Sequence, residues 1–139
     1  MEIEEKIQFL NSLGTKELIA KINEAEEHLQ TALEWDASYR REHVGYLASY
    51  NEDCSTVKNI MAELDPPATE TKLTVAQRES WLRQQRSIHP HLVAAIDLQN
   101  QVTFQVETDR IEIEMAKKKL ESLKAVLGLR TAQIEFLRD

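Results

Sequence analysis

The chain has little of what builds disulfides, membrane spans or secretion signals. Its 139 residues include one cysteine, Cys54, so no intrachain disulfide can form and we expect a reduced, partly buried thiol. Nowhere do 18 apolar residues run together, which argues against a transmembrane helix. The N-terminus also lacks the basic start and apolar core of a signal peptide. These absences predict a cytoplasmic protein, or one in the host cytoplasm if a phage encodes it.

Turn and strand signals are equally scarce. The chain has three glycines, three prolines and 6% aromatic residues, and no β-branched run is bounded by turn residues. We therefore expect an all-α fold. At this length we expect one helical domain over residues 1–139, too thin as a pair of helices to enclose a globular core.

What is present is a repeat of apolar residues in alternating steps of three and four, which is the heptad spacing of coiled coils. The repeat forms two ladders on either side of Pro66 and Pro67. The residues that we expect to pack in the hairpin or oligomer are Leu18, Ile22, Leu29, Tyr39, Tyr46, Tyr50, Val57 and Leu64 in the first ladder, and Leu92, Val102, Val106, Ile113, Leu120, Leu123, Leu127, Ile134 and Leu137 in the second.

The ladders predict a long antiparallel, coiled-coil-like hairpin. A short helix over residues 3–13 ends at Gly14, and one long helix covers residues 15–64, because a single glycine, Gly45, costs only about 1 kcal/mol. A loop over residues 65–73 follows. The second arm covers residues 75–138 and begins at a Thr74–Gln77 capping box.

The second arm is interrupted near residues 89–91. Pro90 either kinks it or splits it into residues 75–88 and 91–138. If the arms fold back about the loop, Leu18 lies near Glu121 and Asp53 lies near Arg86. The last two residues then form an interhelical ion pair.

The net charge of −7 lies entirely in the first arm. Residues 1–64 hold 13 acids and 6 bases, whereas the rest of the chain holds 11 of each. This distribution favours pairing between unlike helices or chains and argues against a simple basic grip on nucleic acid. A local basic stripe remains compatible with phosphate binding.

Motifs for chemistry are missing. Neither His-Glu-x-x-His nor Cys-x-x-Cys spacing occurs, and no glycine-rich phosphate loop or nucleophile motif is found. His89 and His91 flank a proline and do not share a helical face. We therefore expect no catalytic residue, no metal, no cofactor and no small-molecule substrate.

Basic and aromatic residues gather in three places, which are the candidates for nucleic acid. Arginines and lysines can neutralise phosphates while aromatic rings stack on bases. The candidate residues are Tyr39, Arg40 and Arg41; Arg78, Trp81, Arg83 and Arg86; and Lys117, Lys118 and Lys119. Tyr39, Tyr46 and Tyr50 occupy seam positions, for which packing against a partner helix is the commoner role.

Two segments of the second half resemble a known group of proteins. Leu73 to Leu82, in Leu-Thr-Val-Ala-Gln-Arg-Glu-Ser-Trp-Leu, resembles the start of the second helix in small helical proteins encoded beside phage single-strand annealing recombinases. Leu120 to Ile134, ending in Arg130-x-x-x-Ile134, resembles their closing helix and that of the T-even phage recombination mediator. The resemblance implies a non-enzymatic, oligomeric helical protein that binds single-stranded DNA and helps to load a recombinase.

These observations favour an oligomeric accessory protein of phage DNA recombination or replication, which binds itself, single-stranded DNA and a recombinase. The alternatives are an acidic adaptor or inhibitor that covers a basic partner surface, and a purely architectural coiled coil. Oligomerisation is common to all three, because apolar residues such as Leu33, Leu47, Met61 and Ile96 flank the ladders.

Overall fold

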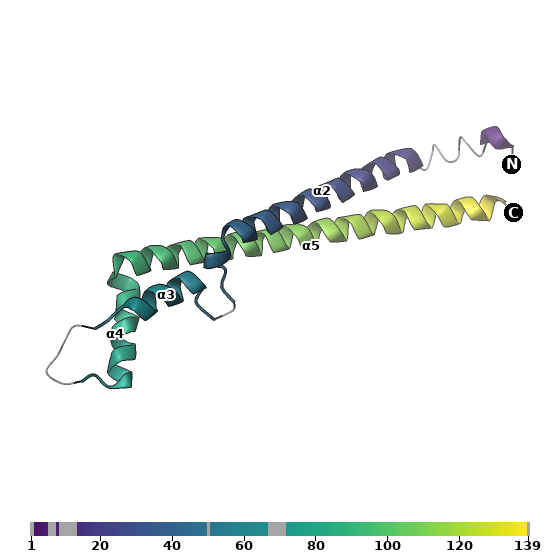
Figure 1. Cartoon of the computed structure of the whole chain (residues 1–139). Helices are drawn as coiled ribbons and strands as arrows, with labels where there is room; N and C mark the ends of the chain where they lie inside the picture. Colours follow the sequence, from purple (N-terminus) through teal and green to yellow (C-terminus); the bar gives the residue numbers. More distant parts are fainter. Residues whose placement is uncertain (1, 6–7, 9–13, 50, 67–71, 139) are drawn as a thin grey trace. The chain divides into compact units, whose positions relative to one another are not determined.

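The fold is all-α in the part of the chain that can be described, because its only regular elements are helices. The computed structural model describes residues 2–5, 8, 14–49, 51–66 and 72–138, and no strand occurs among them. The long helices are α2 (Thr15–Glu42), α3 (Ser55–Glu63), α4 (Val75–Ile88) and α5 (Pro90–Arg138), as Figure 1 shows. A 3₁₀ turn, Val44–Tyr46, follows α2. Residues 3–5 are helical, and most of the helix expected over residues 3–13 lies outside the described residues.

The sequence predicted a single helix over residues 15–64, and this prediction is wrong. α2 ends at Glu42, the 3₁₀ turn follows, and the described residues from Leu47 to Cys54 are not helical before α3 begins at Ser55. Asn51 has a positive φ of 61°, which a continuous helix does not allow. The segment from Ser49 to Thr56 is rich in Asn, Asp, Ser and Thr, whose short polar side chains compete with helical hydrogen bonding.

Side chains hold this break in place. Thr56 Oγ1 donates to the Gly45 carbonyl oxygen at 2.8 Å, which ties α3 to the 3₁₀ turn. The Cys54 N–H donates to Gln99 Oε1 of α5 at 2.7 Å. Each bond satisfies a backbone group that the interrupted helix leaves without its usual partner. The break between α2 and α3 is therefore stabilised by specific hydrogen bonds.

The second arm is split at His89 into α4 and α5. The capping box is present at the start of α4: Gln77 N–H donates to Thr74 Oγ1 at 3.2 Å, and Thr74 N–H donates to Gln77 Oε1 at 2.9 Å. His89 is extended, and Pro90 takes the first position of α5, where its missing N–H costs nothing. Leu92 N–H donates to His89 Nδ1 at 3.4 Å, which caps α5.

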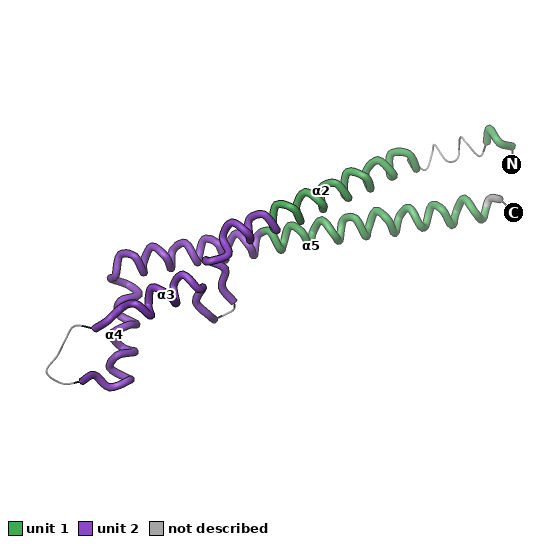
Figure 2. The backbone as a smooth tube through the Cα atoms, in the orientation of Figure 1, with its two compact units in different colours: residues 1–36, 109–139 green, residues 37–108 purple. Residues whose placement is uncertain are grey.

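Contacts divide the chain into two compact units, shown in Figure 2. Unit 1 comprises residues 1–36 and 109–139, and unit 2 comprises residues 37–108. Because α2 and α5 contribute to both units, this division does not test the expectation of one domain.

Unit 1 is an antiparallel pair made by the first part of α2 and the last part of α5. Leu18, Ile22 and Ala25 of α2 pack with Leu120 of α5. A methyl group added at Gly14 would lie 3.4 Å from Arg130 Nη1, and Lys124 Nζ is 3.6 Å from Glu26 Oε1. Residue numbers therefore rise along α2 as they fall along α5.

Unit 2 has a separate core. Cys54 and Val57 pack with Leu92 and Ala95 of α5. Met61 and Ile96, which the sequence suggested as flanking surface for an oligomer, pack against this core instead. They contribute to the fold of unit 2, so the case for assembly must rest on other side chains.

The expected seam residues are placed as follows. Buried are Leu18, Ile22, Val57, Leu92, Val102, Ile113 and Leu120. Half-buried are Leu29, Tyr39, Tyr46, Leu64, Val106, Leu123, Leu127 and Ile134. Tyr50 and the side chain of Leu137 lie outside the described residues. None of the helices in the described ranges has the length and apolar character needed to cross a bilayer.

Candidate nucleic-acid interface

Helix α4 presents the clearest basic and aromatic cluster. Arg78 and Arg83 are exposed, and Trp81 is half-buried. Arg78 lies one helical turn from Trp81, whereas Arg83 projects from the other side of the helix. Among the described residues neither arginine has an ion-pair partner. The capping box fixes the start of the helix, three residues before Arg78. We call Arg78, Trp81 and Arg83 the α4 cluster.

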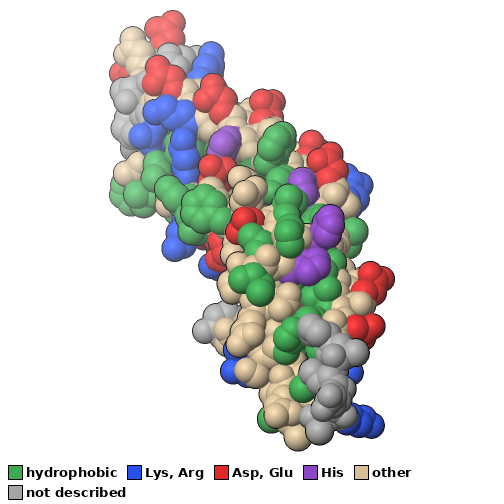
Figure 3. All heavy atoms as spheres, turned by 90° about the vertical axis from the view of Figure 1, so that its left-hand side faces the viewer, with side chains coloured by type: hydrophobic (Ala, Val, Ile, Leu, Met, Phe, Trp, Pro, Cys, Tyr) green, Lys and Arg blue, Asp and Glu red, His purple; other side chains and the backbone are tan. Residues whose placement is uncertain are grey.

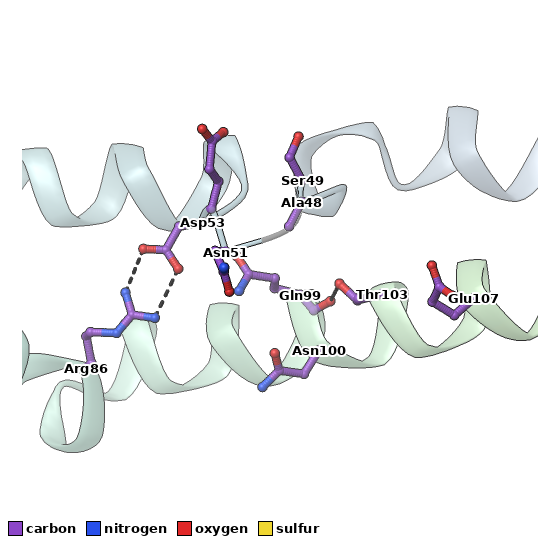
Figure 4. Close-up of a pocket in the computed structure, with 10 residues that line it drawn as sticks. Ala48, Ser49, Asn51, Asp53, Arg86, Gln99, Asn100, Thr103 and Glu107 are labelled. Carbon is purple, nitrogen blue, oxygen red and sulfur yellow. Dashed lines mark hydrogen bonds and ion pairs between the residues drawn. The ribbon is translucent and has the colours of Figure 1, made fainter.

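Arg86, on the same helix, is engaged by Asp53. Its Nη1 donates to Asp53 Oδ2 at 2.7 Å and its Nη2 donates to Oδ1 at 3.0 Å, so the ion pair expected from the sequence is present and bidentate (Figure 4). The hydrogen-bonded Arg86 guanidinium lowers the pKa of Asp53 from its usual 3.8, against the opposite effect of burial. Arg86 therefore serves the fold of unit 2, and it drops out of the candidate interface.

The last turn of α2 carries a second group, Tyr39, Arg40 and Arg41. Tyr39 is half-buried and stacks on His43, with ring centroids 4.2 Å apart. His43 Nδ1 also lies 2.9 Å from the Tyr39 carbonyl oxygen. One face of the tyrosine ring is thus already covered, which disfavours it as a platform for a base. Arg40 and Arg41 are exposed.

The lysines of the third group belong to unit 1. Lys117 Nζ lies 3.7 Å from Glu114 Oε1, one helical turn away. Lys118 and Lys119 are exposed. Lys119 also lines a hollow of about 500 Å³ whose other lining residues include Ala25, His28 and Ala116. The candidate residues are therefore shared between the two units, with the α4 cluster and the end of α2 in unit 2.

A polar pocket of about 650 Å³ opens beside the ion pair in unit 2. In Figure 4, Asn51, Gln99 and Asn100 line it, with Glu107 further along α5. Gln99 Oε1 accepts from Cys54 N–H, and the backbone carbonyl oxygen of Gln99 accepts from Thr103 Oγ1 at 2.8 Å. Cys54 itself is buried. The lining offers hydrogen bonds to a small polar molecule.

The described part of the chain contains no group of three or more His, Cys, Asp or Glu residues that could hold a metal ion. His89 and His91 have ring centroids 5.8 Å apart and tilted planes. His89 also caps α5 and is therefore committed to the fold.

The structure adds surfaces that the sequence reading missed. Ile111, Met115, Leu129 and Phe136 of α5 are exposed, although they are large and apolar. Figure 3 shows hydrophobic side chains lying among charged ones on one face of the molecule. On α2, Glu17, Glu24, Glu27 and Glu34 are exposed on the side away from Leu18 and Ile22. The signal was a second set of heptad positions, opposite the seam.

Comparisons with known proteins identify no relative. No protein-family model, curated protein or solved structure matches the chain.

Proposed function

We propose that this protein is a non-enzymatic accessory protein of DNA recombination or replication, of the phage type, which self-assembles and binds single-stranded DNA in the cytoplasm. The resemblance of Leu73–Leu82 and Leu120–Ile134 to small phage recombination proteins supports it. A recombinase is the protein partner that the resemblance implies.

One observation carries the DNA-binding part: the α4 cluster has two exposed arginines without ion-pair partners among the described residues, and one of them, Arg78, lies one helical turn from Trp81. Arginines without a carboxylate partner are available to phosphates, and release of counterions from the nucleic acid makes such contacts favourable at low salt. An indole face stacks on any base, which suits binding without sequence preference. Arg40, Arg41, Lys118 and Lys119 would add phosphate contacts.

The test is binding of a labelled single-stranded oligonucleotide, followed by fluorescence anisotropy as salt is raised. Arg78→Ala/Arg83→Ala should weaken binding about tenfold or more and reduce the salt slope by about two. The matched control is Lys58→Ala/Lys72→Ala, which removes the same charge from exposed residues of unit 2. Absence of binding at low salt, or an equal loss in the control, would contradict the proposal.

A second candidate function rests on the outer side of α2. Glu17, Glu24 and Glu27 are exposed there and have no ion-pair partner among the described residues, which suits an adaptor or inhibitor that covers a basic partner surface. This candidate function predicts that the protein binds a lysine-rich peptide and does not bind DNA. Glu24→Gln/Glu27→Gln should weaken binding of the peptide. A purely architectural coiled coil predicts that neither pair of charge changes has an effect.

We propose no reaction for the pocket beside Asp53. General acid–base catalysis needs a group that exchanges its proton near the working pH. The Asp53 carboxylate is instead held ionised by Arg86, whose guanidinium lowers the pKa of that carboxyl.

A further inference from the structure

We propose that two copies of this chain associate through the outer face of α5, with their α5 helices antiparallel. We define the outer α5 face by its large residues Ile111, Met115, Leu129 and Phe136 and its small residues Ala125 and Ala132. Lys118 and Ser122 lie in the same stripe. The inference rests on the proposed function, because it names the surface and the geometry of the self-assembly.

The first argument is exposure. Ile111 is 54% exposed, Met115 66%, Leu129 63% and Phe136 82%. The opposite side of the same helix already has a partner, since Leu120 packs on α2 and both Ile113 and Ala116 are buried. A helix that is apolar on two sides buries both of them, and one copy of unit 1 covers only one.

The spacing shows that the exposed residues form one stripe. Along α5 they follow one another at intervals of 4, 14 and 7 residues, which keeps them on one side of a helix in a coiled coil. The stripe from Ile111 to Phe136 is about 38 Å long at 1.5 Å per residue. That is long enough for several layers of side chains to pack against a second helix.

The distribution of size along the stripe fits a second copy in the antiparallel direction. Large residues lie toward the two ends, and Ser122 and Ala125 lie in the middle. When Ser122 faces Ala125 of the second copy, Met115 faces Ala132 and Ile111 faces Phe136. Met115 then packs against the small Ala132, and the two small residues Ser122 and Ala125 let the helices approach closely at the centre.

The charge within the stripe, that of Lys118, also favours the antiparallel arrangement. At the edges of the stripe, three charged residues would face uncharged residues of the second copy. The pairs are Glu121 with Gly128 on one edge, and Lys119 with Val126 and Glu112 with Gln133 on the other. Lys118 would face Leu129, on which its aliphatic stem can pack while the ammonium stays in water. A parallel pair would set Glu114 beside Lys119 of the second copy, an attraction at the exposed edge. It would also set Lys118 against its own copy within the stripe, where two like charges would be desolvated together.

The antiparallel register leaves one repulsion at each end. Glu114 would face Glu135 of the second copy, and both glutamates are exposed. Removing this like-charge pair should strengthen association. Glu135→Gln is therefore expected to tighten the dimer about twofold, an effect that screening by salt should reduce.

Chemical cross-linking tests the direction of the helices. Glu112→Cys and Gln133→Cys place thiols at exposed positions, whereas Cys54 is 1% exposed and protected. A short bismaleimide should join the two variants when they are mixed. It should join neither to itself, because like positions would lie about 32 Å apart along the helix. Efficient self-cross-linking of either variant alone would overturn the antiparallel arrangement.

Sedimentation equilibrium tests the surface. Leu129→Lys should raise the dissociation constant of the dimer about tenfold or more, since each interface loses two buried leucines. Ile19→Lys, the control, places the same charge at an exposed apolar position of α2 and should leave the constant unchanged. The inference is overturned if Leu129→Lys has no effect, if both variants dissociate the dimer equally, or if the wild type is monomeric. Oligonucleotide binding is measured separately on the same variants, so failure of the DNA-binding proposal is distinguishable.

Discussion

At the scale of single residues, Gly45 distinguishes a broken first arm from a continuous rod. A Cβ at Gly45 would lie 2.9 Å from Thr56 Oγ1, the atom that donates to the Gly45 carbonyl oxygen. Gly45→Ala should displace that hydroxyl and lower the free energy of unfolding by about 1 kcal/mol. In a continuous helix the same change would raise it by about 1 kcal/mol. Denaturant unfolding gives the sign.

Gly128 is the matched control for this prediction. It lies within α5, and a Cβ there would meet nothing within 4 Å. Gly128→Ala should therefore raise the free energy of unfolding by about 1 kcal/mol. If Gly45→Ala lowers the free energy of unfolding while Gly128→Ala raises it, the break in the first arm is supported. If both changes raise it, the continuous helix is favoured.

The Asp53–Arg86 pair predicts an acid-sensitive contribution to stability. Arg86 lowers the pKa of Asp53 in the folded chain below 3.8, so the unfolded chain binds more protons in the acid range. The stabilisation is present above about pH 4 and is lost as pH falls through the lowered pKa. Asp53→Asn should cost about 1 kcal/mol at pH 7, a modest value because both side chains are partly exposed.

Unfolding curves measured between pH 7 and pH 3 check this prediction. The gap in stability between wild type and Asp53→Asn should narrow as the solution is acidified. A gap that stayed constant with pH would mean that the ion pair does not contribute through its charge.

At the scale of elements, the start of α4 depends on its capping box. Thr74→Ala removes the oxygen that accepts from Gln77 N–H and should cost about 1 kcal/mol. Because α4 carries Arg78 close to this end, the same change should also weaken oligonucleotide binding. Thr74→Ser keeps the hydroxyl and serves as the control, so equal losses in the two variants would show that the cap is not responsible.

The boundaries of elements were predictable where a local signal sets them. Thr74 with Gln77, and Pro90 after His89, act through one or two backbone groups, and the structure has both features. The break after Glu42 has a weaker signal. The heptad spacing continues through it, and Val57, a ladder residue beyond the break, is buried in the structure.

Long-range pairing was only partly predictable. The simple fold-back register places Asp53 near Arg86, and the ion pair is present. The same register would place Glu26 opposite Ile113, whereas Glu26 pairs with Lys124. Counting residues fails because an extended segment rises about 3.3 Å per residue against about 1.5 Å in a helix.

The candidate surfaces were harder to predict than the core. Reading the seam identifies Leu18 and Leu120 because burial follows the period of the ladder. The outer α5 face has the same period on the opposite side of α5. The sequence alone does not show which of the two sides packs on α2 and which stays exposed. The engagement of Arg86 likewise depends on a long-range contact, which composition cannot reveal.

At the scale of the whole molecule, the proposed function requires both assembly and binding. The chain carries a net charge of −7, so any grip on DNA has to be local. The α4 cluster supplies basic residues without ion-pair partners, and the outer α5 face supplies a route to more than one such cluster in an assembly. Two linked clusters would bind one strand more tightly than either does alone.

This linkage predicts that DNA affinity depends on assembly. Leu129→Lys leaves the α4 cluster intact but should weaken binding of a long oligonucleotide about tenfold or more, while a strand too short to reach two clusters binds equally well. Anisotropy with long and short strands measures both affinities. Equal losses for the two lengths would contradict the linkage.

The most direct test of the account is light scattering of the protein with and without a single-stranded oligonucleotide. We expect a mass of at least two chains of 16.1 kDa each without DNA, and a further increase when the oligonucleotide is added at low salt. A mass of one chain that does not change with oligonucleotide would contradict it.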